Sequence, residues 1–184
     1  GCPITLAAWP GETPVLDGGA RLRSPWTRDP NSPVWSCPVA KGVDIQDLFV
    51  NGKRQPRARM PNQGLFRARD IDGQHESHKT FHFEPGDPIE NWPDLDSAVC
   101  IMRSYQWSED QRGIASIDEE NRTVTLDKTT SYPIVPAKGE HWGRYWIENV
   151  RAALDQPGEW CFNRQRRTLS WWPTDGIDPN LAKI

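Results

Sequence analysis

The chain has 184 residues and a formal net charge of −3, which gives no electrostatic reason to expect a nucleic acid or an anionic membrane as a partner. No apolar run approaches the roughly 18 residues that a membrane span requires. Hydrophobic residues make up 36% of the chain and ten residues are tryptophan, so the composition predicts a buried core and excludes a disordered protein.

The helix-breaking residues of the sequence favour β structure. Seventeen prolines and fourteen glycines are spread along the sequence, where they interrupt nearly every potential helix. Between them stand short apolar runs rich in Val, Ile, Thr and aromatic residues, the pattern of an all-β fold. The chain starts with Gly1-Cys2-Pro3 rather than methionine and shows no signal peptide, so we expect a processed or truncated piece of a longer protein.

The first predicted elements are two short strands, residues 4–8 and 15–19, joined by a Pro-Gly corner at residues 9–14. Together they look like one rung of a parallel β-helix, and a single rung cannot bury its own apolar face. Further along, Asn51-Gly52 separates two strand-like runs. Asn-Gly is a strong hairpin signal, because a type I′ turn needs positive φ at both central residues.

The remaining predicted elements are mostly strands. A single helix is plausible at residues 146–154, where three apolar positions share one face and Pro157-Gly158 ends the pattern. Two more hairpins are predicted, and the longer strands and hairpin arms cover residues 81–84, 98–107, 114–118, 122–126, 160–162 and 168–172.

Four cysteines, Cys2, Cys37, Cys100 and Cys161, are far apart and show no C-x-x-C spacing. A zinc knuckle or a thioredoxin-type site is therefore not expected. Cys100 and Cys161 stand among apolar residues, which favours buried free thiols. Disulfides remain open if the protein is extracellular.

Three histidines cluster at His75, His78 and His82. On a helix His78 and His82 would share a face and could ligate zinc. The alternation around His82 indicates a strand instead, so a polar loop that enters a strand is the favoured interpretation. No metal and no cofactor is predicted.

Paired carboxylates are the usual machinery of a glycosidase. Asp155 and Glu159 flank a Pro-Gly turn beside Trp160, but a turn role, with Asp155 accepting backbone N–H groups, is the favoured interpretation. The sequence contains no G-x-S-x-G, no phosphate-binding loop and no hint of a Ser-His-Asp set. We therefore predict no catalytic residue.

Candidate binding residues are basic and aromatic. Arg57 and Arg59 share one face of a predicted strand and precede Asn62, so they could bind a carboxylate or sulfate of a substrate. The alternative is a salt-bridged strand edge that prevents edge-to-edge pairing. Three tryptophans in or near predicted loops could form an open aromatic face for a sugar: Trp107, Trp142 and Trp146.

Two stretches carry a resemblance to a known family. Residues 48–55 (LFVNGKRQ) with 57–62 (RARMPN), and residues 154–160 (LDQPGEW) with 169–173 (LSWWP), resemble the N-terminal part of right-handed parallel β-helix glycoside hydrolases. Residues 4–12 resemble their first rung. In particular, the chain resembles glycoside hydrolase family 141. It departs from that family at Cys161, where an aromatic residue is usual after Glu-Trp.

The resemblance implies an all-β fold with at most one short helix: a first β-helix rung at residues 1–38, a β-barrel or sandwich-like insertion domain at 39–155, and a returning hairpin at 156–184. It implies an extracellular or periplasmic enzyme of fucosidase or xylanase type, whose catalytic carboxylates lie on later rungs. The expected partners are a polysaccharide or oligosaccharide and the remainder of its own β-helix. The expected role is non-catalytic shaping of the substrate cleft, with Arg57, Arg59, Asn62, Trp107 and Trp142 as candidate binding residues; the alternatives are a carbohydrate-binding module without hydrolysis and a purely structural β-helix cap.

Overall fold

The structure, a computed structural model, describes residues 2–15, 18–71, 76–136, 143–174 and 176–184. This part of the chain contains thirteen short strands and two 3₁₀ turns, which confirms the all-β prediction. In chain order they are β1 (Thr27–Arg28), β2 (Trp35–Pro38), β3 (Leu48–Val50), β4 (Lys53–Gln55), β5 (Arg59–Met60), β6 (Phe66–Arg67), β7 (Thr80–His82), η1 (Leu95–Ser97), β8 (Val99–Arg103), β9 (Asp110–Asp118), β10 (Thr123–Leu126), β11 (Arg144–Glu148), η2 (Arg151–Ala153), β12 (Trp160–Asn163) and β13 (Thr168–Trp171).

The first of two lobes, here called the barrel lobe, is an antiparallel sheet in the order β5-β11-β8-β9-β10-β7, with β6 also paired to β11. The sheet closes on itself just after β6, where Arg69 and His82 of β7 exchange backbone hydrogen bonds of 2.8 and 2.9 Å. This closure gives the lobe the form of a barrel. Its interior is filled by alternate, inward-facing residues of the strands, such as Phe81, Met102, Val124 and Ile147.

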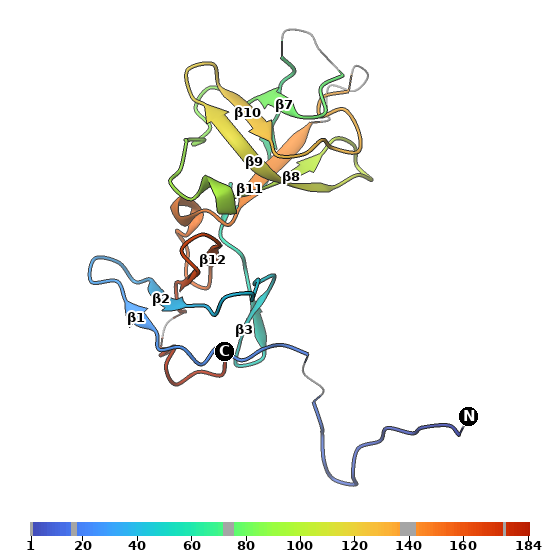
Figure 1. Cartoon of the computed structure of the whole chain (residues 1–184), viewed down its shortest axis with the longest axis vertical. Coiled ribbons are helices and arrows are strands. Elements are labelled where there is room, and N and C mark those ends of the chain that lie inside the picture. The colour runs from blue at the N-terminus through green and yellow to red at the C-terminus, as the bar shows by residue number, and fades with distance from the viewer. Residues whose placement is uncertain (1, 16–17, 72–75, 137–142, 175) are drawn as a thin grey trace.

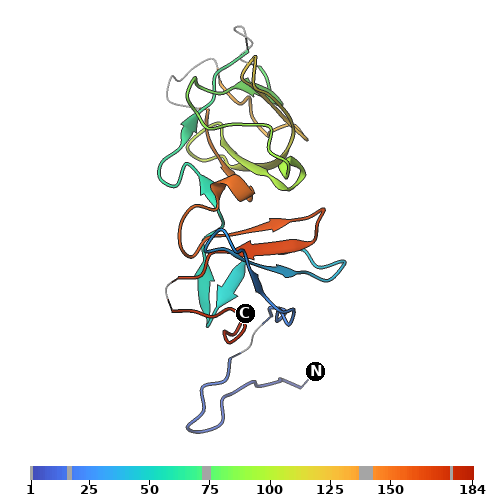
Figure 2. The same ribbon diagram turned by 90° about the vertical axis from the view of Figure 1, so that its left-hand side faces the viewer.

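The second lobe, here called the sheet lobe, pairs β1 and β2 with β12 and β13 from the other end of the chain, in the order β1-β2-β13-β12. Figure 2 shows the orange-red β12–β13 hairpin beside β2, in blue. The β3–β4 hairpin packs its apolar side against this sheet, so the lobe has a core of its own. That core contains Trp26, Cys37, Val39, Ile45, Leu48, Val50, Trp160, Phe162, Leu169 and Trp171. The division of the chain into residues 1–38, 39–155 and 156–184 stays a prediction.

The two lobes are stacked end to end in both views (Figures 1 and 2) and are joined by two neighbouring segments. Between them Ala58 donates its N–H to Trp160 O at 2.8 Å and accepts from Asn149 N–H at 2.9 Å. The segment before β5 therefore lies between the start of β12 and the end of β11. This junction fixes the position of the surfaces that face each other across it.

All three predicted hairpins are present, as β3–β4, β9–β10 and β12–β13. In the first, Asn51 and Gly52 have φ values of 49° and 78°. Positive φ at both central residues is what the Asn-Gly signal predicts. Local turn chemistry was therefore a reliable guide to these elements.

The helix predicted at residues 146–154 is wrong. Residues up to Glu148 form β11, which is paired with β8 over five residues, and the helical part is confined to η2. Tyr145 and Ile147 point into the barrel while Trp146 points out, so the true period is two. Asn149 then has a φ of 67°, a value that ends a regular strand and that an α-helix does not contain.

The rung strand predicted at residues 4–8 is also wrong for this chain, because residues 2–15 contain no strand. In both views this blue trace runs away from the sheet lobe (Figures 1 and 2), and Ile4 is 89% exposed. A strand needs a neighbour for its hydrogen bonds and its apolar face. The second rung strand falls partly on residues 16 and 17, outside the described residues. All pairs of named strands are antiparallel, and the flanking parallel β-helix stays a prediction.

The cysteines are free thiols, with Cys37, Cys100 and Cys161 buried and Cys2 exposed. This confirms the interpretation of Cys100 and Cys161 as small apolar core residues. Within the described residues, no helix is long and apolar enough to cross a membrane.

Candidate functional site: a cleft between the two lobes

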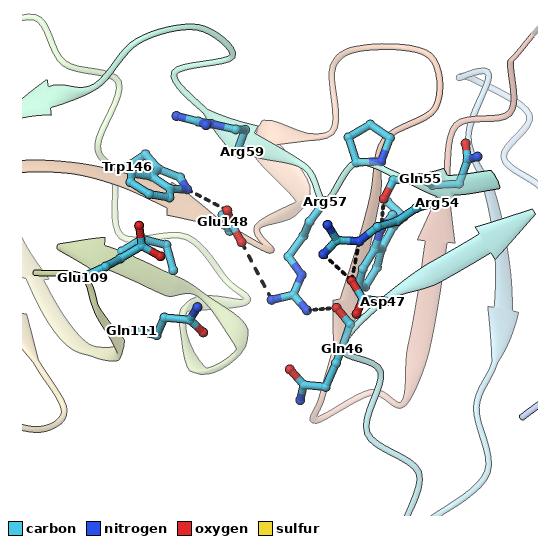
Figure 3. Close-up of a pocket in the computed structure, with 13 residues that line it drawn as sticks. Gln46, Asp47, Arg54, Gln55, Arg57, Arg59, Glu109, Gln111, Trp146 and Glu148 are labelled. Atoms are coloured by element: carbon cyan, nitrogen blue, oxygen red, sulfur yellow. Dashed lines mark hydrogen bonds and ion pairs between the residues drawn. The ribbon is translucent and has the colours of Figure 1, made fainter. Parts of the chain in front are cut away.

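A cleft of about 610 Å³ lies where the barrel lobe faces the sheet lobe. Figure 3 shows side chains that enter it from both sides. It is lined by Gln46, Asp47, Arg54, Gln55, Pro56, Arg57, Arg59, Ile101, Glu109, Gln111, Trp146, Glu148 and Trp160.

Arg57 connects the two walls of the cleft. One Nη donates to Gln46 O at 2.6 Å in the sheet lobe, and the guanidinium lies 4.8 Å from the centre of the Trp160 ring. The other Nη faces the Glu148 carboxylate of the barrel lobe at 3.8 Å (Figure 3). Burial lowers the pKa of the Arg57 guanidinium, and the charge of Glu148 opposes that shift. Groups from both lobes therefore hold the Arg57 guanidinium in place.

The barrel wall is built around Trp146 on the outer face of β11. Arg59 and Arg103 place their guanidinium groups 4.8 and 5.2 Å from its ring centre. Its indole N–H donates to Glu148 Oε1 at 2.6 Å. Arg59 is fixed by donating to the carbonyls of Pro61 and Gly64 at 3.0 and 2.8 Å. The ring is thus covered by cations, and it is only 8% exposed.

Charges in the cleft are balanced. Asp47 accepts a bond of 2.7 Å from Arg54, and Glu109 accepts bonds of 2.9 and 3.1 Å from Arg103 at the rim. With Glu148 beside Arg57, each acidic side chain that lines the cleft faces an arginine. Arg59 lies over Trp146, and the other polar side chains of the lining include the amides of Gln46, Gln55 and Gln111, which donate and accept hydrogen bonds without charge. Such a lining suits a neutral, hydroxyl-rich ligand better than a highly charged one.

The predicted binding residues are only partly brought together. Arg57 and Arg59 both line the cleft, whereas Asn62 lies outside the lining and donates to Asp155 Oδ1 at 2.8 Å. Trp107 is 72% exposed on the loop between β8 and β9. Trp142 lies outside the described residues. A role of these residues in substrate binding stays a prediction.

Trp146 is not the open loop aromatic that the sequence suggested, because it belongs to β11 and is covered by arginines. Glu148, Gln46 and Gln111 were missed as cleft residues. The alternation of Trp146 and Glu148 was the available signal, but the helix prediction placed them on different faces. Gln46 and Gln111 come from different lobes, and no local pattern joins them.

The turn at Asp155 and Glu159 has the predicted structural role with the residues exchanged. Glu159, not Asp155, accepts the backbone N–H groups, from Asp155 at 3.0 Å and Gln156 at 3.1 Å. Glu159 is 4% exposed, and its burial raises the pKa of the carboxyl group. The longer side chain can fold back over the turn, which the shorter Asp155 does not do.

The histidines have structural partners. His78 Nδ1 lies 2.9 Å from Thr130 O, and His82 Nδ1 lies 3.0 Å from Thr123 Oγ1. His82 ends β7, as the loop-into-strand interpretation predicted. His75 lies outside the described residues. Among the described residues, no group of three or more His, Cys, Asp or Glu side chains could hold a metal ion.

Comparison with known proteins gives a fold and no family. No protein-family model matches the sequence, and no curated protein matches it. A solved structure titled "Glycoside hydrolase" superposes with a TM-score of 0.67 and 19% sequence identity over 89% of this chain. The match covers 30% of that protein, so the present chain spans less than a third of its length. At this identity the likeness shows a shared fold.

Proposed function

We propose that this chain is a non-catalytic portion of a secreted, polysaccharide-degrading glycoside hydrolase and that its interlobe cleft forms part of the path of the sugar chain. The observation that carries this proposal is the fold shared with a glycoside hydrolase over 89% of the chain, combined with a cleft that this fold creates between its lobes. The fucosidase- or xylanase-like character of the parent enzyme rests on the sequence resemblance.

The lining of the cleft supports a sugar ligand. Gln46 and Gln111 are exposed side chains on opposite walls, and their amides can donate to and accept from hydroxyl groups. The arginines are fixed by backbone carbonyls and aromatic rings before any ligand arrives. A preorganised polar site loses less conformational entropy on binding than a mobile one.

The acidic residues of the cleft support a non-catalytic role. A glycosidase needs one carboxyl group that carries a proton to the leaving group, and apolar surroundings usually supply that property. Here Asp47, Glu109 and Glu148 each face an arginine. Glu148 also accepts the indole N–H of Trp146, so its position is that of a hydrogen-bond acceptor.

Affinity electrophoresis of the whole chain in gels with xylan, fucoidan or pectin tests the cleft. We expect at least one of them to retard the chain, and Gln46→Ala and Gln111→Ala each to raise the dissociation constant about fivefold, the loss of one hydrogen bond. Gln165→Ala is the matched control, because Gln165 is an exposed amide in the β12–β13 turn, outside the cleft. Equal affinities of all three variants and the parent chain would contradict the proposal.

A hydrolysis assay tests the non-catalytic part. The chain is incubated with fucosyl and xylosyl oligosaccharides, and released sugar is measured. We expect none above the buffer blank. Hydrolysis that disappears in Glu148→Gln or Glu109→Gln would overturn this part of the proposal and make the cleft an active site.

A further inference from the structure

The loop between β8 and β9 carries an aromatic cluster outside the lining of the cleft. The rings of Tyr105 and Trp107 are stacked, with centres 4.9 Å apart and an angle of 8° between their planes. Tyr132, from the segment after β10, packs edge-on against Tyr105 at 5.4 Å and 87°. Although Tyr105 lies against it, Trp107 remains 72% exposed. We call these three residues the aromatic platform.

The platform is held in place by polar contacts beneath it. Tyr105 N–H donates to Ser108 Oγ at 2.9 Å, and Ser108 N–H donates back to Tyr105 O at 3.2 Å. The Asp110 carboxylate, buried at the start of β9, accepts both the N–H and the hydroxyl of Ser131 at 2.9 Å. The loop that presents Trp107 and the segment that presents Tyr132 are therefore fixed relative to the barrel.

High exposure alone does not give a tryptophan of this chain a stacked neighbour. Trp9 is 75% exposed, about as much as Trp107, yet within the described residues it has no ring contact. Among the described tryptophans, Trp107 is the exposed one whose ring plane is set by neighbours. A preset plane is what a flat ligand face requires.

We propose that the aromatic platform binds the face of a pyranose ring in a polysaccharide, as a contact additional to the cleft. The face of an indole ring carries negative charge density and attracts the polarised C–H groups of a sugar face. A charged pair of the same loop adds hydrogen-bonding groups: Arg103 and Glu109 stand at the two ends of the loop, and Glu109 also lines the cleft. One sugar chain can therefore meet the cleft rim and the platform in succession.

The setting favours a sugar over a protein or a membrane. Binding surfaces for those partners are centred on contiguous apolar side chains. The platform instead shares its loop with the exposed polar side chains of Gln106 and of the Arg103–Glu109 pair. A stacking ring surrounded by hydrogen-bonding groups matches a ligand with apolar faces and hydroxyl edges.

Oxidative footprinting with N-bromosuccinimide tests the platform on the whole chain. Exposed indoles are oxidised, and the rate at each tryptophan is followed by mass spectrometry of its peptide. With a polysaccharide that retards the chain, we expect oxidation of Trp107 to slow at least fivefold while Trp9 is unchanged. Equal rates at Trp107 with and without the polysaccharide would refute the platform. Protection of Trp107 that grows with protein concentration alone would assign the surface to a second copy of the chain.

Variants separate the platform from the cleft. Trp107→Ala should raise the dissociation constant about tenfold, and Tyr105→Ala, which removes the ring that sets the plane of Trp107, about threefold. Trp9→Ala should have no effect. If Gln111→Ala weakens binding and Trp107→Ala does not, the platform is refuted and the proposed cleft stands. The reverse pattern refutes the cleft and leaves the platform. If none of the three polysaccharides retards the chain, both are refuted.

Discussion

Asn149 is the residue on which the junction of the two lobes depends most directly. It is 3% exposed, and its side-chain amide donates to Ser97 O in the barrel lobe at 2.7 Å and to Phe162 O in the sheet lobe at 2.9 Å. Its Oδ1 accepts from Phe162 N–H at 2.7 Å. Removing the amide deletes these three buried hydrogen bonds, each worth about 1 kcal/mol net, so we expect a loss of about 3 kcal/mol. That is a large part of a typical stability of about 5–15 kcal/mol.

Two substitutions separate the hydrogen bonds from the backbone. Asn149 has a φ of 67°, which Gly adopts freely and Ala does not. Asn149→Ala adds backbone strain in the left-handed region, and Asn149→Gly adds conformational freedom to the unfolded chain. Each effect lowers the stability by about 1 kcal/mol. The shared loss of about 3 kcal/mol is therefore the contribution of the amide.

The measurement is equilibrium unfolding in urea followed by tryptophan fluorescence. With a slope of about 2 kcal/mol per molar, both variants should lower the midpoint by about 1.5–2 M. Asn121→Ala is the control, because its amide donates to Asp118 at 2.8 Å on the exposed β9–β10 turn and should contribute less than about 1 kcal/mol. A loss below about 1 kcal/mol in Asn149→Gly would refute the reasoning.

Three further predictions concern other parts of the chain. Iodoacetamide near pH 8 should label Cys2 and spare Cys37 and Cys161, because burial raises the pKa of both thiols to about 12; labelling of all sites in the folded chain would contradict this. Burial raises the pKa of the Glu159 carboxyl group above its ordinary value of 4.5, so this group ionises at a lower pH in the unfolded chain than in the folded chain. Its protonated form therefore stabilises the fold below pH 4.5, and this contribution is lost as the pH rises through the folded-state pKa. Glu159→Gln should remove that slope from midpoints measured between about pH 4 and 7, and an unchanged slope would count against it. Arg122→Gly should raise stability by about 0.5 kcal/mol in the same urea assay, since Arg122 has a φ of 52° in an exposed turn, and a loss would show that its side chain matters more than its backbone.

The sequence was informative wherever structure is decided locally. Asn51-Gly52 predicted its hairpin because the turn depends on the φ preferences of two residues. Residues 146–154 were misread because Ile147, Val150 and Leu154 fit a helical spacing. Pairing of β11 with β8 overrides that local preference, and only the folded barrel supplies this partner.

The candidate site was less accessible to prediction, since it is made by non-local packing. Arg57 and Arg59 were identified because their spacing puts them on one strand face, and both line the cleft. Gln46 and Gln111 face them from different lobes, which meet only after β12 returns to the segment before β5. Nothing in the order of residues indicates that contact.

The position of Arg57 decides how the cleft can be tested. Its guanidinium is held by Gln46 O and Trp160 on one side and by Glu148 on the other, so a buried charge is compensated only when the lobes are in place. Replacing Arg57 would leave Glu148 without its cation and would disturb the junction itself, so lost binding in such a variant would not distinguish a ligand contact from a folding defect. Gln46 and Gln111 are exposed, and the hydrogen bond of the Gln46 amide, to Asp44 at 2.7 Å, lies at the surface and not across the junction. They are therefore the positions at which a sugar contact can be separated from the packing that creates the cleft.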